Sequence, residues 1–149
     1  HMNRQKLYFD MDGVLVDFAS GVAKLSEETK KEYEGRIDEV PGLFALMDPM
    51  PGAIEAVQLL AKHYDVYILS TSPWGNTTAA SDKIEWVKKH MNGVFHKRVI
   101  LTHHKELLMG DFLIDDRGKN GTSEFLGEWI HFGSERFPDW DAVLEHLLM

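Results

Sequence analysis

The sequence predicts an α/β protein built on a parallel β-sheet with helices on both faces. Short apolar runs at residues 7–9, 66–69, 99–101 and 112–114 alternate with stretches in which apolar side chains recur at helical spacing. Alternation of strands with helices is typical of parallel sheets that are covered on both sides. Such sheets bind ligands beyond the carboxyl ends of their strands, so the residues that follow each run are the candidate functional residues.

The first half of the chain contains one predicted strand, one charged segment and one predicted helix. The strand ends at Asp10, where the apolar run stops, and Gly13 supports a tight turn directly after it. Residues 24–39 are mostly charged, so we expect a solvated helical insertion there. Pro51 lies just ahead of the helix, at a position where proline is tolerated. Four apolar residues share one face of that helix: Ile54, Val57, Leu60 and Ala61.

The second half continues the alternation. The strand that ends at residue 69 is followed by the polar loop 70–73 and by a helix whose apolar positions are Ala80, Ile84, Val87 and Met91. Two short strands follow, and a further strand is expected at 129–132. Asp139 is a predicted N-cap of the last helix, because its carboxylate can accept a hydrogen bond from the first turn.

Composition limits the classes of function. The 149 residues, 44% hydrophobic and 27% charged, suit one globular domain over residues 1–149. The absence of cysteine excludes a disulfide scaffold, thiolate zinc sites and cysteine nucleophiles. The net charge of −8 argues against binding to a nucleic-acid polymer. No apolar run approaches the ~20 residues of a membrane span, so a cytoplasmic location is expected. His1 and Met2 resemble a remnant of cloning.

Polar residues gather where the predicted strands end. Three pairs each follow the carboxyl end of a strand: Asp10 and Asp12, Thr71 and Ser72, and Asp115 and Asp116. Because parallel strands end at one edge of the sheet, these pairs are expected to meet there. Four carboxylates at one edge repel one another unless a cation neutralises them. Mg²⁺ prefers oxygen ligands and often bridges to a substrate phosphate. The pattern therefore predicts a magnesium site that faces a phosphorylated ligand.

The same residues suit phosphoryl transfer. Asp10 could attack phosphorus and form an aspartyl-phosphate, which splits one hard displacement into two easier ones. Asp12 points to the same side of an extended chain as Asp10, and it could protonate the leaving oxygen and activate the water. Hydroxyl and cationic partners for the phosphate are available from Thr71, Ser72 and Lys105, with Lys83 as the alternative lysine.

These motifs resemble a known group of enzymes. The segment DMDGV (10–14), followed in order by Thr71, Lys105 and Asp115-Asp116, resembles the haloacid dehalogenase-like superfamily of phosphatases. Three longer parts are similar to the 5'(3')-deoxyribonucleotidase family: DMDGVLVDF (10–18), DPMPGAIEAV with ILSTSP (48–57 and 68–73), and LTHHKELLMGDFLIDDR (101–117). The resemblance implies a Rossmann-like sheet with a small helical cap inserted at about residues 19–47.

The resemblance also implies roles for individual acidic residues. Asp10 matches the nucleophile and a direct magnesium ligand. Asp12 matches the acid/base, with its backbone carbonyl also on the metal. Asp116 matches the acidic metal ligand, and Asp115 is its partner, which acts directly or through water.

Substrate contacts are implied in the same way. Thr71 and Lys105 match the phosphate binders, and Ser72 lies beside them. Aromatic pocket positions of the family are matched by Phe18 and Phe44, with Trp74 where another pocket side chain lies. The insertion between Asp17 and Pro49 is shorter than in the animal members, and further aromatics of the longer cap have no counterpart.

The expected function is a Mg²⁺-dependent phosphomonoesterase that acts on (deoxy)nucleoside monophosphates through an aspartyl-phosphate. The alternative within this chemistry is another small phosphorylated metabolite, such as a sugar phosphate. Two other classes are a phosphoacceptor signalling domain and a non-catalytic binding protein. The order of the motifs disfavours the former, and the presence of both Asp10 and Asp12 disfavours the latter. The pattern carries no indication of oligomeric state.

Overall fold

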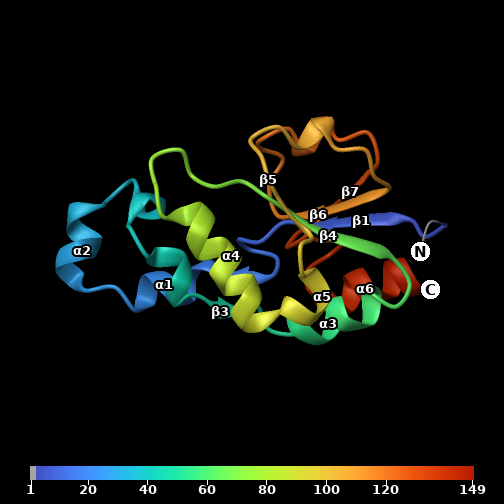
Figure 1. Ribbon diagram of the computed structural model, residues 1–149, viewed down its shortest axis with the longest axis horizontal. Coiled ribbons are helices and arrows are strands. Elements are labelled where there is room, and N and C mark those ends of the chain that lie inside the picture. The colour runs from blue at the N-terminus through green and yellow to red at the C-terminus, as the bar shows by residue number, and fades with distance from the viewer. Residues whose placement is uncertain (1–2) are drawn as a thin grey trace.

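A five-stranded parallel sheet forms the centre of the protein (Figure 1). The computed structural model describes residues 3–149, and the interpretation of His1 and Met2 lies outside the described residues. In spatial order the strands are β5 (Val99–Leu101), β4 (Asp65–Ser70), β1 (Lys6–Phe9), β6 (Phe112–Asp115) and β7 (Glu128–His131). The predicted parallel sheet is confirmed, with strand boundaries close to the predicted ones.

The order of the strands creates a crevice beside β1. The chain runs from β1 through β4 to β5, and then returns across β1 to β6 and β7. Its direction therefore reverses between β1 and β6, and open α/β sheets bind ligands at such a reversal. In register, Phe9 of β1 pairs with Ile114 of β6, and the backbone N–H of Asp10 donates to the Ile114 carbonyl at 2.8 Å. Asp10 and Asp115 consequently meet at the crevice.

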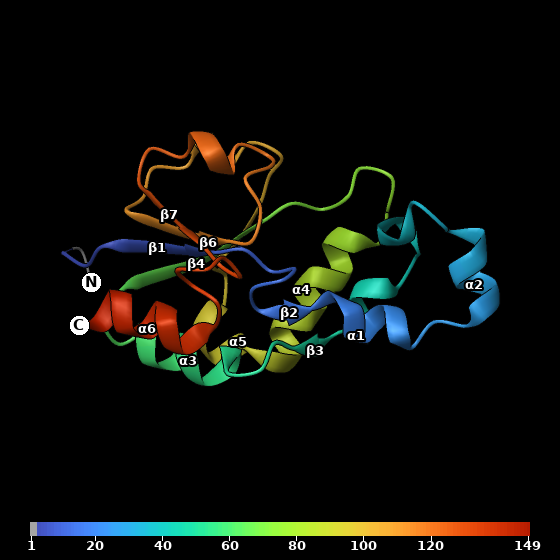
Figure 2. The ribbon, with the colours of Figure 1, turned by 180° about the vertical axis from the view of Figure 1, so that it is seen from behind.

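The two faces of the sheet are covered unequally. On one face, Leu7 and Phe9 of β1 pack into a large apolar cluster with the helices α3 (Ala53–Leu60), α4 (Ala79–His90), α5 (Asn92–Phe95) and α6 (Trp140–Leu148) (Figures 1 and 2). On the other face, Tyr8 packs in a small cluster with Phe125. Within the described residues, that face carries only the 3-10 helices η3 (Lys105–Leu107) and η4 (Thr122–Glu124).

Chain length and glycine content explain this asymmetry. The connections on either side of β6 span residues 102–111 and 116–127, and the second contains Gly118, Gly121 and Gly127. A helical crossover needs a dozen or more residues, and glycine disfavours helix interiors. The connections around β6, which the structure describes in full, therefore form no α-helix. The α-helices that pack on the sheet cover its other face.

The C-terminal helix supports the loop that follows Asp12. The carboxylate of Asp139 accepts a hydrogen bond from the Ala142 backbone N–H at 3.0 Å, which confirms the predicted N-cap. In the first residue of the helix, directly after this N-cap, the indole N–H of Trp140 donates to the Val14 carbonyl at 3.0 Å. Trp140 is buried, so this bond ties the start of α6 to the turn after β1.

A mostly helical segment lies beyond the carboxyl ends of the strands. Two short antiparallel strands, β2 (Val16–Asp17) and β3 (Asp48–Pro49), bring its ends together. Between them lie α1 (Phe18–Ala23), α2 (Glu27–Glu32), η1 (Ile37–Glu39) and η2 (Leu43–Leu46). Figures 1 and 2 show α2 at the end of the molecule opposite the two termini. No residue of α2 is buried, in keeping with its charged sequence.

Hydrogen bonds hold this segment against the body of the protein. The side-chain amide of Asn76, which is buried, donates to the carbonyls of Asp38 at 3.0 Å and Val40 at 3.1 Å. The indole N–H of Trp86 in α4 donates to the Met47 carbonyl at 2.9 Å. The segment is thereby fixed over the crevice at two places. Among the described residues, the helices are too short or too polar to cross a lipid bilayer.

Candidate active site

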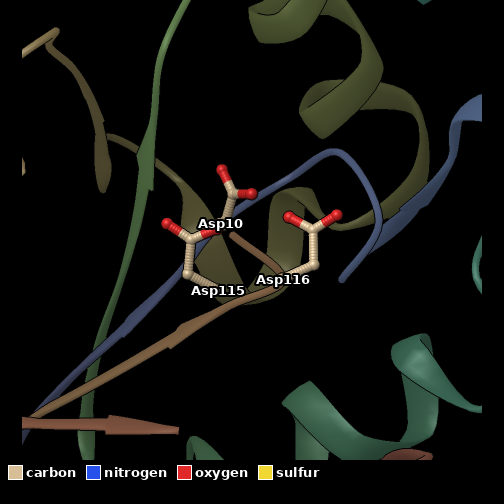
Figure 3. Close-up of side chains that lie close together, drawn as sticks. All are labelled: Asp10, Asp115 and Asp116. Carbon is tan, nitrogen blue, oxygen red and sulfur yellow. The ribbon is translucent and has the colours of Figure 1, made fainter. Parts of the chain in front are cut away.

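Three carboxylates converge at the crevice between β1 and β6. Asp10 follows β1, Asp115 ends β6, and Asp116 is the next residue. Each offers an oxygen, and these oxygens lie within 4.8 Å of one another. Figure 3 shows the three side chains projecting to the same side of the strand ends. The structure thus brings together acidic residues that lie near opposite ends of the sequence.

Lys105 lies between two of these carboxylates. Its side chain is buried, and the ammonium donates to Asp10 Oδ1 at 3.0 Å and to Asp115 Oδ2 at 2.8 Å. Burial alone would lower the pKa of Lys105, but the two carboxylates outweigh it and raise that pKa. Since an ammonium has three donors, one remains for a ligand.

The three carboxyl groups differ in their affinity for protons. Burial raises the pKa of Asp10 well above its usual value, although Lys105 opposes the rise. Burial, followed by the charge of Asp115, raises the pKa of Asp116 to about 6. Burial also opposes ionisation of Asp115, but Lys105 outweighs it and lowers the pKa of that group. Asp10 and Asp116 therefore gain most from a further positive charge.

The free oxygens of the cluster belong to Asp10 and Asp116. Asp115 Oδ2 accepts from Lys105 and from the Thr122 hydroxyl, and Oδ1 accepts from the Arg117 backbone N–H at 3.2 Å. Asp116 Oδ1, in contrast, is buried without a hydrogen-bond partner within residues 3–149. A buried, unpartnered carboxylate oxygen is costly. This donor set fits a hard divalent cation, which prefers carboxylate oxygens.

Gly13 lets the turn after β1 approach Asp116. Its φ of +79° is left-handed, and its N–H donates to the Val16 carbonyl at 2.9 Å. A Cβ atom built on Gly13 would overlap the Asp116 carboxylate. Glycine is therefore required here both by the backbone conformation and by the lack of space.

Gly13→Ala is expected to reduce activity more than stability. The left-handed backbone costs an alanine about 1–2 kcal/mol, and the added methyl group must also displace the Asp116 carboxylate. Gly133→Ala is the matched control, because Gly133 has a φ of +85° and open space where a Cβ would be. Urea unfolding and turnover measured on both variants separate the two effects. Equal turnover in the two variants would contradict the role of the close approach.

Asp12 has a different lysine partner. Lys83 of α4, the alternative lysine, lies 3.3 Å from Asp12 Oδ2 and does not contact Asp10. The lysine is fully buried, whereas the side chain of Asp12 is 24% exposed. The two lysines thus serve different carboxylates.

A cleft adjoins the carboxylate cluster. Its volume is about 810 Å³, within the range of small-molecule sites. One wall is formed by the helical segment, including Phe18, and another by the loop after β4, including Trp74. The smaller polar cavity at its base is lined by Asp10, Asp12, Thr71, Lys105, Asp115, Arg117, Lys119 and Asn120. A small polar recess of about 20 Å³ therefore adjoins a larger, partly aromatic cleft.

The two polar residues after β4 both line the cleft. The Thr71 hydroxyl donates to the Thr102 carbonyl at 2.6 Å, which fixes its orientation. Ser72 Oγ is buried and has no partner among the described residues, so it is available to a ligand.

The aromatic residues expected in the pocket are placed differently from one another. Phe18 lines the cleft, and Trp74 is 90% exposed at its rim, with the His103 ring 5.7 Å away. Phe44 is buried below them, with its ring centroid 6.2 Å from that of Phe18 and 4.7 Å from Lys83 Nζ. Contrary to the expectation for Phe44, this ring packs beneath the site and does not line the cleft, because η2 directs it into the core.

Several residues of the site were not expected from the sequence. The Thr122 hydroxyl donates to Asp115. Asn120 lines the polar cavity, and its backbone carbonyl accepts a hydrogen bond from the Lys105 backbone N–H at 2.8 Å. Arg117 and Lys119 line the same cavity. The only signal for them in the sequence is that they closely follow the Asp115-Asp116 pair.

Comparison with known proteins assigns the family. A profile described as "5' nucleotidase, deoxy (Pyrimidine), cytosolic type C protein" matches residues 36–139. A protein of Vibrio phage KVP40, named "Putative 5'(3')-deoxyribonucleotidase", is 55% identical over 141 residues, which cover 95% of this chain and 83% of the phage protein. The chain belongs to the 5'(3')-deoxyribonucleotidase family. The resemblance noted in the sequence is thereby confirmed, and the family is one of phosphomonoester hydrolases.

Other members of the deoxyribonucleotidase family are more distant. The human "5'(3')-deoxyribonucleotidase, cytosolic type" is 30% identical over 155 residues, covering 85% of this chain and 77% of the human protein. A Staphylococcus epidermidis protein named "Putative 5'(3')-deoxyribonucleotidase" is 32% identical over 152 residues, covering 88% of this chain and 84% of that protein.

Solved structures confirm the fold of the deoxyribonucleotidase chain. The "putative HAD-hydrolase YfnB" of Bacillus subtilis, bound to magnesium, superposes with a TM-score of 0.66 at 11% identity, covering 98% of this chain and 99% of that one. A HAD-superfamily hydrolase of Geobacter sulfurreducens superposes with a TM-score of 0.65 at 13% identity, covering 97% of this chain and 96% of that one. At these identities the likeness concerns the fold alone.

Proposed function

We propose that this protein is a Mg²⁺-dependent phosphomonoesterase that dephosphorylates deoxynucleoside monophosphates through an aspartyl-phosphate on Asp10. The observation that carries the proposal is the cluster of Asp10, Asp115 and Asp116 around Lys105, at the base of a cleft large enough for a nucleoside. A cytoplasmic location is proposed with it, since a human relative is named as cytosolic.

Asp10 is the nucleophile in this proposal. Its Oδ1 is held by Lys105, and its second oxygen lies beside a polar cavity that also contains Thr71. That oxygen attacks phosphorus, the bond from phosphorus to the ester oxygen breaks, and the electron pair leaves with the ester oxygen. Fixing the carboxylate in this way removes much of the entropic cost of the displacement.

Asp12 moves the proton in both steps. As a carboxylic acid it protonates the departing ester oxygen, and as a carboxylate it then takes a proton from the water that attacks the aspartyl-phosphate. The side chain lines both the polar cavity and the cleft, so it can reach the leaving group of a bound ester.

A divalent cation completes the charge balance. Asp116 would hold it directly, because its Oδ1 has no partner among the described residues, and the carboxylate of Asp10 would share the ion, while Asp115 is occupied by Lys105, Thr122 and the Arg117 backbone N–H. When bound, the cation neutralises the charge of the phosphate and the carboxylates. Lys105, with one donor left, and the Ser72 hydroxyl would bind the phosphate oxygens, and the Thr71 hydroxyl would join them by turning its one O–H away from the Thr102 carbonyl.

The cleft is suited to a nucleoside. Phe18 and Trp74 offer aromatic surface for a base, and the exposed indole of Trp74 is otherwise unexplained in the wall of the cleft. A sugar phosphate would use the polar cavity but leave these aromatic surfaces uncovered. The aromatic wall therefore favours a nucleotide over a sugar phosphate.

The proposal is tested by phosphate release from deoxynucleoside and nucleoside monophosphates and from sugar phosphates, with Mg²⁺ and with a chelator. We expect metal-dependent turnover that is fastest on deoxynucleotides and absent from Asp10→Asn. Fastest turnover on sugar phosphates would keep the chemistry and remove the nucleotide assignment. Absence of turnover on every ester would overturn the proposal as a whole.

Magnesium is expected to stabilise the fold. At a concentration 100 times its dissociation constant, a ligand that binds only the native state adds about 2.7 kcal/mol to the free energy of unfolding. Thermal unfolding with and without Mg²⁺ should therefore show a higher Tm with the ion, and Asp116→Asn should reduce that rise. Glu124→Gln is a control of the same charge change at an exposed position. An undiminished rise in Asp116→Asn would exclude Asp116 as a ligand.

A further inference from the structure

Lys83 is buried in a position where a lysine requires a reason. It lies in α4 on the same face as the buried residues Ala79, Trp86 and Val87, and its side chain has no exposed surface. Lysine is rarely buried completely unless it is paired, because removing an ammonium from water is costly. Something in the site must therefore compensate this charge.

Three acceptors surround the ammonium. Lys83 Nζ donates to Ser70 Oγ at 2.7 Å and to the Thr71 carbonyl at 3.0 Å, and it lies 3.3 Å from Asp12 Oδ2. The ring of Phe44 lies 4.7 Å from the same atom, which adds a cation–π contact. An ammonium has three donors, and all three are used. Lys83 therefore has no donor left for a phosphate, unlike Lys105.

The carboxylate of Asp12 depends on this lysine. Its Oδ2 is paired with Lys83, and its Oδ1 is buried without a hydrogen-bond partner within residues 3–149. Lys83 is thus the side chain that orients the Asp12 carboxyl group in the described part of the chain. Because the lysine is also bonded to Ser70 and Thr71, it ties Asp12 to the loop that carries the phosphate-binding hydroxyls.

From this geometry we propose that Lys83 is the positioning residue of the acid/base: it fixes the Asp12 carboxyl group and stabilises the carboxylate that remains after Asp12 has protonated the leaving oxygen. This inference rests on the proposed function. In the step concerned, the ester oxygen leaves with the electron pair of its bond to phosphorus and takes the proton of Asp12. The negative charge left on Asp12 then lies 3.3 Å from the Lys83 ammonium.

The proposal assigns a separate lysine to each aspartate of the first motif. Lys105 serves the nucleophile Asp10, and Lys83 serves Asp12. A loss of Lys105 would impair every substrate. A loss of Lys83 should matter only where the leaving oxygen needs a proton, and this difference provides the test.

The experiment compares two phosphate esters in Lys83→Met. A deoxynucleoside 5'-monophosphate has a poor alkoxide leaving group, whereas p-nitrophenyl phosphate leaves as a stable anion and needs little protonation. The ratio kcat/KM reports the steps up to transfer of the phosphoryl group to Asp10. For the nucleotide we expect it to fall about 10- to 100-fold, part of the contribution of a general acid. For the aryl ester we expect less than about a threefold fall on the same grounds.

Two controls keep the result specific to Asp12. In an Asp12→Asn background, Lys83→Met should lower kcat/KM for the nucleotide by less than about threefold, because residues that act through one another are not additive. Lys89→Met, at an exposed position of the same helix, should leave both substrates unaffected. Lys83→Gln, which can still donate hydrogen bonds, replaces Lys83→Met if circular dichroism shows that the latter does not fold.

The outcomes separate this inference from the proposed function. Inhibition of the nucleotide reaction by inorganic phosphate should be unchanged in Lys83→Met. Equal losses on both esters, additivity with Asp12→Asn, or phosphate inhibition weakened tenfold or more would overturn the positioning role, while the wild-type activity stands. A wild-type protein without activity on any phosphate ester would instead remove the proposed function, and the inference with it.

Discussion

Asp10→Asn is expected to lower the turnover of phosphate esters by at least about 10⁴-fold, since loss of a nucleophile removes the covalent route altogether. An amide oxygen is a much weaker nucleophile than a carboxylate, and Lys105 cannot compensate for it. The measurement is phosphate release with Mg²⁺ at saturating substrate. Turnover within about tenfold of the wild type, a small part of that expected loss, would remove Asp10 from the mechanism.

The same substitution is expected to leave the metal-free protein as stable as the wild type, or more stable. Burial raises the pKa of Asp10 well above its usual value, so the folded state binds a proton at this site more tightly than the unfolded state does. Such a group contributes less stability as the pH rises through its unfolded pKa toward its folded pKa. Asparagine has nearly the same shape and no charge, so the penalty disappears.

Urea unfolding at pH 7 without metal tests this second expectation. A matched control is Asp111→Asn, because Asp111 is exposed and precedes β6, at the opposite end of that strand from Asp115. A large loss of stability in Asp10→Asn would show that its contact with Lys105 outweighs the cost of burying the carboxylate. If Asp10→Asn loses turnover and gains stability, the carboxylate of Asp10 serves the function of the protein while destabilising its fold.

The sheet and the convergence of its polar ends could be predicted from sequence because both depend on local signals. The run before Asp10 is apolar throughout, and so is the run before Asp115. Topology then required only that parallel strands end at one edge. No knowledge of packing was needed to expect Asp10 and Asp116 within reach of one cation.

The roles of the two lysines could not be predicted in this way. Lys83 lies in the helix after the Thr71 loop and Lys105 lies in the loop before Asp115, and neither position in the sequence shows which carboxylate the ammonium will reach. They are distinguished by which acceptors surround each ammonium, a property of packing between α4, β4 and η3. Phe18 and Phe44 differ for the same reason, since only their local helices decide which ring faces the cleft.

The unequal layers of the sheet also depend on information that periodicity lacks. Nothing in the apolar runs indicates that Tyr8 would face short loops while Phe9 faces helices. The decisive factor is the length of the connections around β6, which must hold Lys105 and Thr122 against Asp115 rather than form a helix. The site thus determines the form of these connections.

Lys105→Met is expected to have the largest effect on stability. It removes the cation shared by Asp10 and Asp115 and leaves two buried carboxylates without this cationic partner. Breaking a buried ion pair from one side typically costs about 3–5 kcal/mol. Turnover should also fall at least about 10²-fold, since the lysine stabilises charge next to the transferring group. Urea unfolding at pH 7 without metal and phosphate release with Mg²⁺ measure the two effects.

The loss of stability in Lys105→Met is expected to depend on pH, with a definite sign. In the wild type, Lys105 lowers the pKa of Asp115, so the stability that Asp115 contributes is lost as the pH falls through its usual range. In Lys105→Met, the buried carboxylates take up protons on folding, so lowering the pH stabilises the variant. The difference in unfolding free energy between the two proteins should therefore narrow from pH 7 to pH 5. A difference that widens would contradict the ion pairs as its origin.

A double substitution separates the loss of the ion pair from the loss of packing. If Lys105→Met destabilises because Asp10 is left charged and buried, adding Asp10→Asn should restore part of the unfolding free energy at pH 7. If the lost packing of the lysine stem is the cause, the second substitution should restore nothing. Suppose that adding Asp10→Asn restores unfolding free energy but not turnover. The negative charge of Asp10 would then be shown to lower the stability of the fold while being required for catalysis, and Lys105 would be the residue that balances it.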